Sequence, residues 1–218
     1  MKSARILFIG NSFTNRNDMP GILARLGAAA KPPISIKNDR VIANGRALKT
    51  HWERGEALAA IRSSKWKYVV LQEQSTLPLK HPARMHEYIR LFDAEIKMNG
   101  AQTVLYMTWA RRHEWERRVE LSQAYISIGK SIGAIVAPVG VAWQRMLSER
   151  PDLVLHDKDN SHPNFAGTYL TACVFFAALF KRSPEGLETS DLPAVKRFGP
   201  GTAPALQRAA WQSIRARE

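Results

Sequence analysis

Residues 5–14 read R-I-L-F-I-G-N-S-F-T, and this stretch decides the expected fold. Residues 6–9 form a short, fully apolar run, which is typical of a parallel strand buried on both faces. The run ends at Gly10-Asn11-Ser12, whose small side chains suit a tight turn and let a ligand approach the backbone closely. Ser12 is therefore expected just past the carboxyl end of the strand, where open α/β sheets bind their ligands.

Four further apolar runs follow along the chain, and segments with helical periodicity separate them. Strands are expected at residues 34–42, 68–71, 103–107 and 134–139. Helices are expected at about residues 18–30, 48–62, 82–98, 116–132, 141–149, 163–180 and 204–215. This alternation implies one parallel sheet with helices on both faces. We expect an α/β fold, a three-layer α/β/α sandwich with about five strands, formed by residues 1–218 as a single domain.

The composition is ordinary for a globular protein, with 218 residues of which 45% are hydrophobic and 23% charged. No run approaches the ~18 apolar residues that cross a bilayer, so no membrane span is expected. The short apolar run behind Lys2 and Arg5 does not match a signal peptide, although a longer precursor is compatible with the sequence. Cys173 has no partner for a disulfide within the chain, and a reducing, cytoplasmic location is the expectation.

The formal net charge of +13 is the one unusual bulk property. The basic residues are scattered in short pairs such as Arg111-Arg112, without a long basic tract or a nucleic-acid-binding motif. We therefore expect a strongly basic surface rather than a specific nucleic-acid interface. The charge also predicts a bias toward anionic substrates.

Polar residues follow several of the expected strands, and the carboxyl ends of parallel strands meet at one edge of a sheet. Ser12, Gly45, residues 72–75 and the Thr108-Trp109 pair fall at this edge. Ser12 would serve there either as a nucleophile or as the cap of the next helix.

Asp159 and His162 lie three residues apart, directly before Pro163 and the expected helix that begins there. In a turn, a carboxylate at position i can reach a histidine at i+3, accept a hydrogen bond from Nδ1 and leave Nε2 free to take a proton. If Nε2 faces Ser12, the three side chains form a nucleophile, a general base and its orienting acid. Two alternatives stay open: Asp159 caps the helix, or Asp157 orients the histidine.

An acyl-transfer serine also needs donors for the oxyanion of its intermediate. The backbone N–H groups of Ser12 and Gly45 and the side-chain amide of Gln74 are the expected donors, with Gln72 as the alternative amide. Gly45 equally suits a plain turn, and either glutamine could instead bind strand-end backbone groups. Gln72 and Trp109 are also expected to contact the substrate. The indole ring of Trp109 can stack on a sugar or cover an acyl group. The histidines lack metal-ligand spacing, so no metal ion or other cofactor is expected.

Residues 6–14, with G-N-S at Gly10-Asn11-Ser12, resemble the first block of the SGNH (GDSL-like) esterase and lipase superfamily, in which G-D-S is commoner. The D-N-S-H-P segment at residues 159–163 resembles its last block, D-x-x-H, which supplies the acid and the base. Gly45 falls where the glycine of the second block is expected. Q-E-Q-S at residues 72–75 replaces the usual G-x-N-D, with Gln74 in the position of the oxyanion asparagine. The resemblance implies a flavodoxin-like α/β/α fold and a Ser-His-Asp triad that hydrolyses esters without a metal ion.

Proteins of this superfamily with glutamine in the third block resemble bacterial enzymes on the carbohydrate-esterase side. We therefore expect a serine esterase that hydrolyses short-chain esters, most simply acetyl esters, of a small molecule or a carbohydrate. The alternative is a non-catalytic module on the same fold, in which the Gly10-Asn11-Ser12 turn and the following helix bind an anion, or in which the positive charge alone binds a polyanion. The sequence makes no prediction of the oligomeric state.

Overall fold

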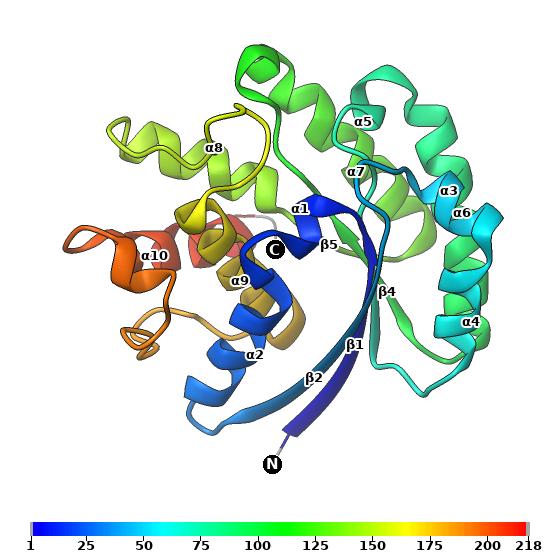
Figure 1. The fold of residues 1–218 in the computed structure, drawn as a ribbon, viewed down its shortest axis with the longest axis horizontal. Coiled ribbons are helices and arrows are strands. Elements are labelled where there is room, and N and C mark those ends of the chain that lie inside the picture. Colours follow the sequence, from blue (N-terminus) through cyan, green and yellow to red (C-terminus); the bar gives the residue numbers. More distant parts are fainter. Residues whose placement is uncertain (1, 217–218) are drawn as a thin grey trace.

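The computed structural model describes residues 2–216, which form one five-stranded sheet flanked by helices (Figure 1). All pairings between neighbouring strands are parallel, and the strand order is β2-β1-β3-β4-β5. The strands are β1 (Lys2–Gly10), β2 (Ile34–Ile42), β3 (Tyr68–Leu71), β4 (Gln102–Tyr106) and β5 (Ile135–Ala137). This is the flavodoxin-like order, and the expected three-layer α/β/α fold is confirmed.

The helices cover both faces of the sheet (Figure 1). One face carries α2 (Met19–Ala29), α8 (Val139–Glu149), α9 (Phe165–Phe180) and α10 (Thr202–Arg215). The other face carries α3 (Leu48–Arg54), α4 (Glu56–Arg62), α6 (Pro82–Met98) and α7 (Arg118–Ile132). Two single-turn helices, α1 (Ser12–Asn15) and α5 (Leu77–Lys80), follow β1 and β3, and short 3₁₀ helices cover Arg16–Asp18, Arg112–Arg117 and Val195–Arg197.

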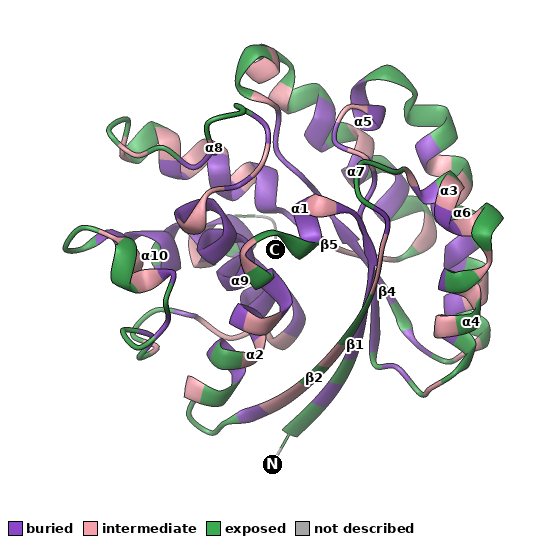
Figure 2. Ribbon diagram, viewed as in Figure 1, coloured by how far each residue is buried: buried purple, intermediate pink, exposed green. Residues whose placement is uncertain are grey.

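Strand β1 lies between β2 and β3, and residues 6–10 of it are buried on both faces, which explains the apolar run at residues 6–9. Ile6 and Phe8 belong to the core on the α2, α8, α9 and α10 side, whereas Leu7 and Ile9 belong to the opposite core. This alternation follows from the two-residue period of a strand. Helix α9 is buried along nearly its whole length, because it packs against α2, α8, α10 and the sheet (Figure 2).

One predicted helix is divided in the structure, and one short helix was not predicted. The helix expected over residues 48–62 is two helices, because Gly55 adopts a φ of +77° that ends α3 and precedes α4. Helix α5 was not expected, since its four residues are too few to show a periodicity. Within residues 2–216, no helix combines the length and the apolar character that crossing a bilayer requires.

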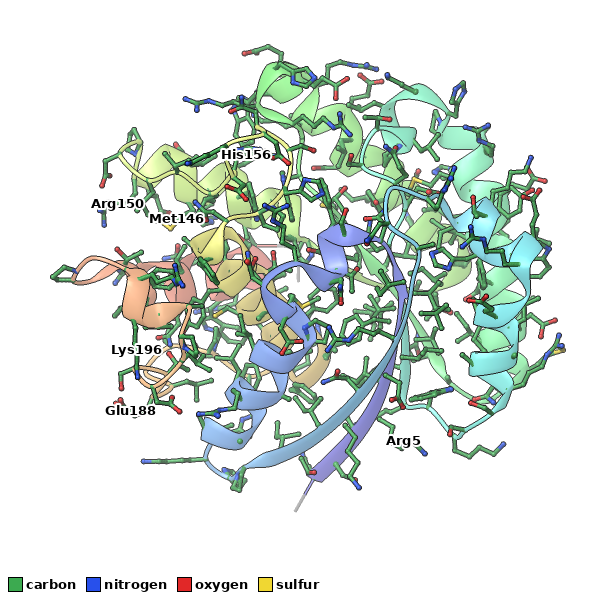
Figure 3. All side chains as sticks on the ribbon, in the orientation of Figure 1. Arg5, Met146, Arg150, His156, Glu188 and Lys196 are labelled. Atoms are coloured by element: carbon green, nitrogen blue, oxygen red, sulfur yellow. The ribbon has the colours of Figure 1, made fainter. Side chains whose placement is uncertain are left out.

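Basic side chains lie on widely separated parts of the molecule. Figure 3 shows Arg5 beside the start of β1, Arg150 after α8 and Lys196 on the segment before α10. The positive charge is therefore distributed over several elements, as the scattered basic pairs in the sequence predict.

Candidate active site

The turn after β1 presents the Ser12 hydroxyl at the carboxyl edge of the sheet. Asn11, not Ser12, caps helix α1, because its Oδ1 accepts a hydrogen bond from the backbone N–H of Phe13 at 3.1 Å. Ser12 is the first residue of that helix, and its hydroxyl is free to interact across the edge of the sheet. The capping role considered for Ser12 thus belongs to its neighbour.

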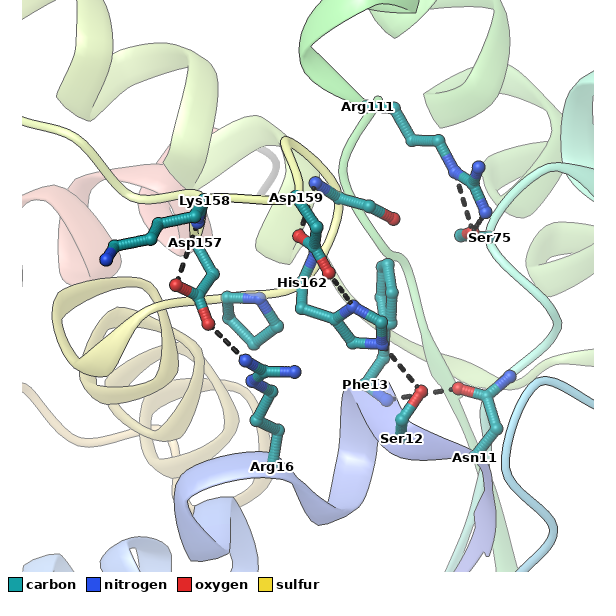
Figure 4. A network of polar contacts seen from close by, with 12 residues as sticks. Asn11, Ser12, Phe13, Arg16, Ser75, Arg111, Asp157, Lys158, Asp159 and His162 are labelled. Atoms are coloured by element: carbon teal, nitrogen blue, oxygen red, sulfur yellow. Dashed lines mark hydrogen bonds and ion pairs between the residues drawn. The ribbon is translucent and has the colours of Figure 1, made fainter.

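Ser12, His162 and Asp159 form a continuous hydrogen-bonded chain (Figure 4). The Ser12 Oγ lies 2.8 Å from His162 Nε2, and His162 Nδ1 lies 2.5 Å from Asp159 Oδ2. With the proton on Nδ1, the imidazole donates to the carboxylate and accepts from the hydroxyl. The structure therefore brings together the three residues that the sequence singled out, across a separation of 150 positions.

A closed turn before α9 positions the carboxylate and the imidazole. His156 and Pro163 form an isolated antiparallel bridge, and the N–H of Asp157 donates to the carbonyl of His162 at 2.7 Å. Inside this turn, Asp159 Oδ1 accepts from the N–H groups of Ser161 and His162 at 3.0 and 2.9 Å. Burial acts to raise the pKa of Asp159, but these hydrogen bonds and the one from the imidazole lower it to about 2.

Neither alternative for this turn is found in the structure: Asp159 does not cap the next helix, and Asp157 does not orient the histidine. Asn164 caps α9, since its Oδ1 accepts from the N–H of Gly167 at 3.0 Å, so Asp159 is not the cap. Asp157 pairs with Arg16 and accepts from the N–H of Lys158, and Figure 4 shows its carboxylate turned toward Arg16. Asp159 is therefore the carboxylate that contacts the imidazole.

Aromatic rings support the imidazole from the core side. The ring of Phe13 lies 5.1 Å from that of His162 and stacks on Trp109 at 4.9 Å, and Trp109 stacks on Trp143 at 3.9 Å. Trp109 is 1% exposed, and its Nε1 donates to the carbonyl of Ser161 at 3.0 Å. This burial corrects the expectation that Trp109 contacts the substrate. Its ring instead fixes the backbone next to the histidine.

Gln72 is also a structural residue. Its side chain is fully buried, Oε1 accepts from the N–H of Asn11 at 2.9 Å and from Thr14 Oγ1 at 3.0 Å, and Nε2 donates to the carbonyl of Glu73. A Cβ on Gly10 would lie 2.6 Å from Oε1, so the glycine makes room for this amide. The expectation that Gln72 contacts substrate or the oxyanion is corrected, because its amide is used within the protein.

Gln74 and Gly45 lie on loops beside the nucleophile turn. Gln74 Oε1 accepts from the N–H and the hydroxyl of Thr76, whereas its Nε2 has no hydrogen-bond acceptor within residues 2–216. Gly45 is exposed with a φ of +69°, and its N–H likewise meets no acceptor in the described chain. The next carbonyl, of Arg46, accepts from Asn11 Nδ2 at 3.0 Å and ties this loop to the turn before Ser12.

A buried carboxyl that the sequence did not single out connects both loops. Glu73 Oε1 accepts from the N–H of Leu48, at the start of α3, and from the N–H of Gln74, at 3.1 and 2.6 Å. Burial raises the pKa of Glu73 to about 7. The available signal was a charged residue two positions after the buried strand β3. Glu73 thus fixes the position of the loop that carries Gly45 relative to the loop that carries Gln74.

Glu73→Gln is expected to change how stability depends on pH. The folded chain holds the Glu73 proton more tightly than the unfolded chain, so the stability from this group is complete below its unfolded pKa of 4.5 and is lost as pH rises toward 7. From pH 5 to 8, the free energy of unfolding of the wild type should fall by about 3 kcal/mol more than that of the variant. Urea unfolding at both pH values measures this. Parallel pH dependences would contradict the shifted pKa.

Three further histidines, of which His51 and His156 are buried, donate to backbone carbonyls. His51, His86 and His156 use Nε2 to reach the carbonyls of Gly10, Ala124 and Ala110 at 2.9, 2.8 and 3.1 Å. Burial lowers the pKa of His51 and His156, which favours the neutral ring. No group of three His, Cys, Asp or Glu side chains within residues 2–216 is arranged to hold a metal ion.

No protein-family model and no curated protein matches the chain. A DUF4886 family protein from Bacteroides uniformis is similar over 98% of this chain and 95% of its own, with a TM-score of 0.78 and 20% identity. A proposed SGNH hydrolase from Slackia heliotrinireducens covers 82% of this chain and 100% of its own, with a TM-score of 0.67 and 27% identity.

A variant of an acetylxylan esterase from Geobacillus stearothermophilus also has a similar structure. It covers 82% of this chain and 95% of its own, with a TM-score of 0.60 and 17% identity. These structures support the resemblance to the SGNH superfamily at the level of architecture. The chain has the three-layer α/β/α fold that is found in SGNH hydrolases.

Proposed function

We propose that the protein is a serine ester hydrolase that uses Ser12 as nucleophile, His162 as general base and Asp159 as its orienting acid. The observation that carries this proposal is the hydrogen-bonded chain from the Ser12 hydroxyl through the imidazole to the carboxylate. Structural similarity to proteins named as SGNH hydrolases and acetylxylan esterase supports the same reaction class.

The reaction proceeds in two acyl-transfer steps. Ser12 Oγ attacks the ester carbonyl while His162 Nε2 takes the hydroxyl proton, and a tetrahedral oxyanion forms. The C–O bond to the alcohol then breaks, and the imidazolium returns the proton to the leaving oxygen. Water repeats the sequence on the acyl-enzyme and releases the acid. Asp159, ionised above about pH 2, stabilises the imidazolium throughout.

Three donors hold the oxyanion in this proposal. They are the N–H groups of Ser12 and Gly45 and the Nε2 of Gln74. The support is that neither the Gly45 N–H nor the Gln74 amide nitrogen meets an acceptor within the described residues. Asn11 and Glu73 keep the loops that carry these two donors next to the nucleophile turn.

Acetyl esters of carbohydrates are the proposed substrates. The acetylxylan esterase with a similar structure supports both the short acyl group and the sugar. The anion-binding alternative has less support, because α1 contains only four residues and its first hydroxyl is bound to an imidazole.

Hydrolysis of 4-nitrophenyl acetate tests this function and the composition of the oxyanion hole. The wild type should hydrolyse the acetate faster than the octanoate, and Gln74→Ala should lower kcat by about 10²-fold, the effect of removing one oxyanion donor. Gln74→Glu keeps an acceptor for Thr76 but removes the N–H donor, so it should be at least as impaired.

Unchanged kcat in both Gln74 variants would show that backbone N–H groups alone hold the oxyanion. No hydrolysis of either ester by the folded wild type would contradict the proposed function itself.

A further inference from the structure

Arg111 carries a charge at the edge of the sheet that no carboxylate within residues 2–216 neutralises. Its Nε and Nη2 donate to Ser75 Oγ at 3.3 and 3.0 Å, and these are the hydrogen bonds of its guanidinium within the described residues. Ser75 is only 4% exposed, and Arg111 is half-buried. By contrast, Arg16 and Arg117 each pair with a carboxylate.

The topology places this guanidinium on the same edge as Ser12. Ser12 follows β1, Ser75 follows the neighbouring β3, and Arg111 follows β4 beyond it. Two strand spacings of ~4.8 Å put the β4 loop about 10 Å from the nucleophile turn. The loop also contacts the turn that carries the imidazole, since the N–H of Arg112 donates to the carbonyl of Asn160 at 3.0 Å.

Figure 4 shows Arg111 extended toward Ser75, on the Asn11 side of Ser12 and opposite the Arg16–Asp157 pair. The serine hydroxyl thus holds the planar group in one orientation without cancelling its charge. The guanidinium has five N–H donors, and those not directed at Ser75 remain available to a ligand. A carboxylate matches this fork geometry, with two parallel N–H···O bonds.

We propose that Arg111, oriented by Ser75, binds the carboxylate of the substrate, so that the ester cleaved is an O-acetyl group on a carboxylate-bearing sugar. This inference rests on the proposed esterase function and adds the class of the alcohol. Ser12 and the β4 loop lie about 10 Å apart, and the arginine side chain reaches across part of this distance. The remaining distance suits an O-acetyl group at Ser12 and a carboxylate at Arg111 on one sugar ring. The net charge of +13 adds a general attraction for such an anion.

The test compares two acetylated substrates of nearly equal shape: a mono-O-acetyl methyl glucuronoside and the corresponding glucuronamide. The wild type should prefer the acid in kcat/KM by about 10- to 100-fold, the effect of a hydrogen bond to a charged group. Arg111→Gln should bring this ratio to about 1. Arg111→Lys keeps the charge but not the fork, and should retain only a small part of the preference.

Arg90→Gln, which removes one exposed charge from α6, is the matched control and should leave the ratio unchanged. Thermal unfolding of each variant checks that the fold is intact. A wild-type ratio near 1, a ratio unaffected by Arg111→Gln, or an equal loss in Arg90→Gln would overturn the inference.

The outcomes separate the two levels of the proposal. Hydrolysis of 4-nitrophenyl acetate and of both sugars at equal rates would overturn the carboxylate subsite and leave the esterase function standing. No hydrolysis of any of the three acetates would overturn the esterase function, and the subsite with it.

Discussion

Ser12→Ala is expected to lower kcat/KM for 4-nitrophenyl acetate by at least about 10⁴-fold, because no acyl-enzyme can form without the nucleophile. The residual rate would come from binding and from the oxyanion donors. The substitution should leave the fold intact, since the Ser12 hydroxyl contacts the half-buried site rather than the core, and alanine is well tolerated at a helical position.

Ser127→Ala provides the control for Ser12→Ala, because Ser127 is exposed on α7 and its hydroxyl bonds only the local carbonyl of Ala124. The control should retain full activity. Steady-state kinetics of the three proteins, prepared in parallel, gives the comparison. If Ser12→Ala keeps more than about a tenth of the wild-type rate, another group attacks the ester.

Asp159→Asn is expected to lower kcat by about 10³-fold. The amide oxygen can still accept from the N–H groups of Ser161 and His162, which turns the amide NH₂ toward His162 Nδ1. The imidazole must then carry its proton on Nε2, the nitrogen that should take the proton of Ser12. The expected loss is smaller than for a buried triad acid, because the Asp159 side chain is 45% exposed and solvent screens its charge.

Asp157→Asn is the matched control for Asp159→Asn. It changes the same atoms two residues away, in a carboxylate that pairs with Arg16 rather than with the imidazole. Its kcat should stay within about threefold of the wild type, because the Asp157 carboxylate does not contact the imidazole. The fold should also be unaffected, since an exposed ion pair contributes little to stability. The effect of each substitution on the reaction is measured as the pre-steady-state rate of acylation. Equal effects of the two substitutions would remove Asp159 from its assigned role.

Strands β1, β3 and β4 were predictable because they are largely buried on both faces, which demands continuous apolar runs such as residues 6–9. The contact between Ser12 and His162 was predictable from the rule that functional loops gather at the carboxyl edge of parallel strands. Both inferences need only the order of elements, not the packing of particular side chains.

The roles of the glutamines and of Trp109 depend on packing, and the sequence does not reveal them. Gln72 points under Gly10 because that glycine leaves space, and this pairing joins residues from different strands. Trp109 follows a strand and reads as a loop residue, yet Phe13 and Trp143 enclose it from two other elements. Glu73 was overlooked because a carboxylate is ordinarily exposed, whereas here two backbone N–H groups satisfy it.

Covalent labelling tests the central claim most directly. An alkyl fluorophosphonate should modify the wild type at one site, and mass spectrometry should place the adduct on Ser12 within the tryptic peptide of residues 6–16. Labelling should disappear in Ser12→Ala and slow strongly in His162→Ala, because the imidazole activates the hydroxyl. An adduct on a different residue, or equal labelling of Ser12→Ala, would contradict Ser12 as the nucleophile.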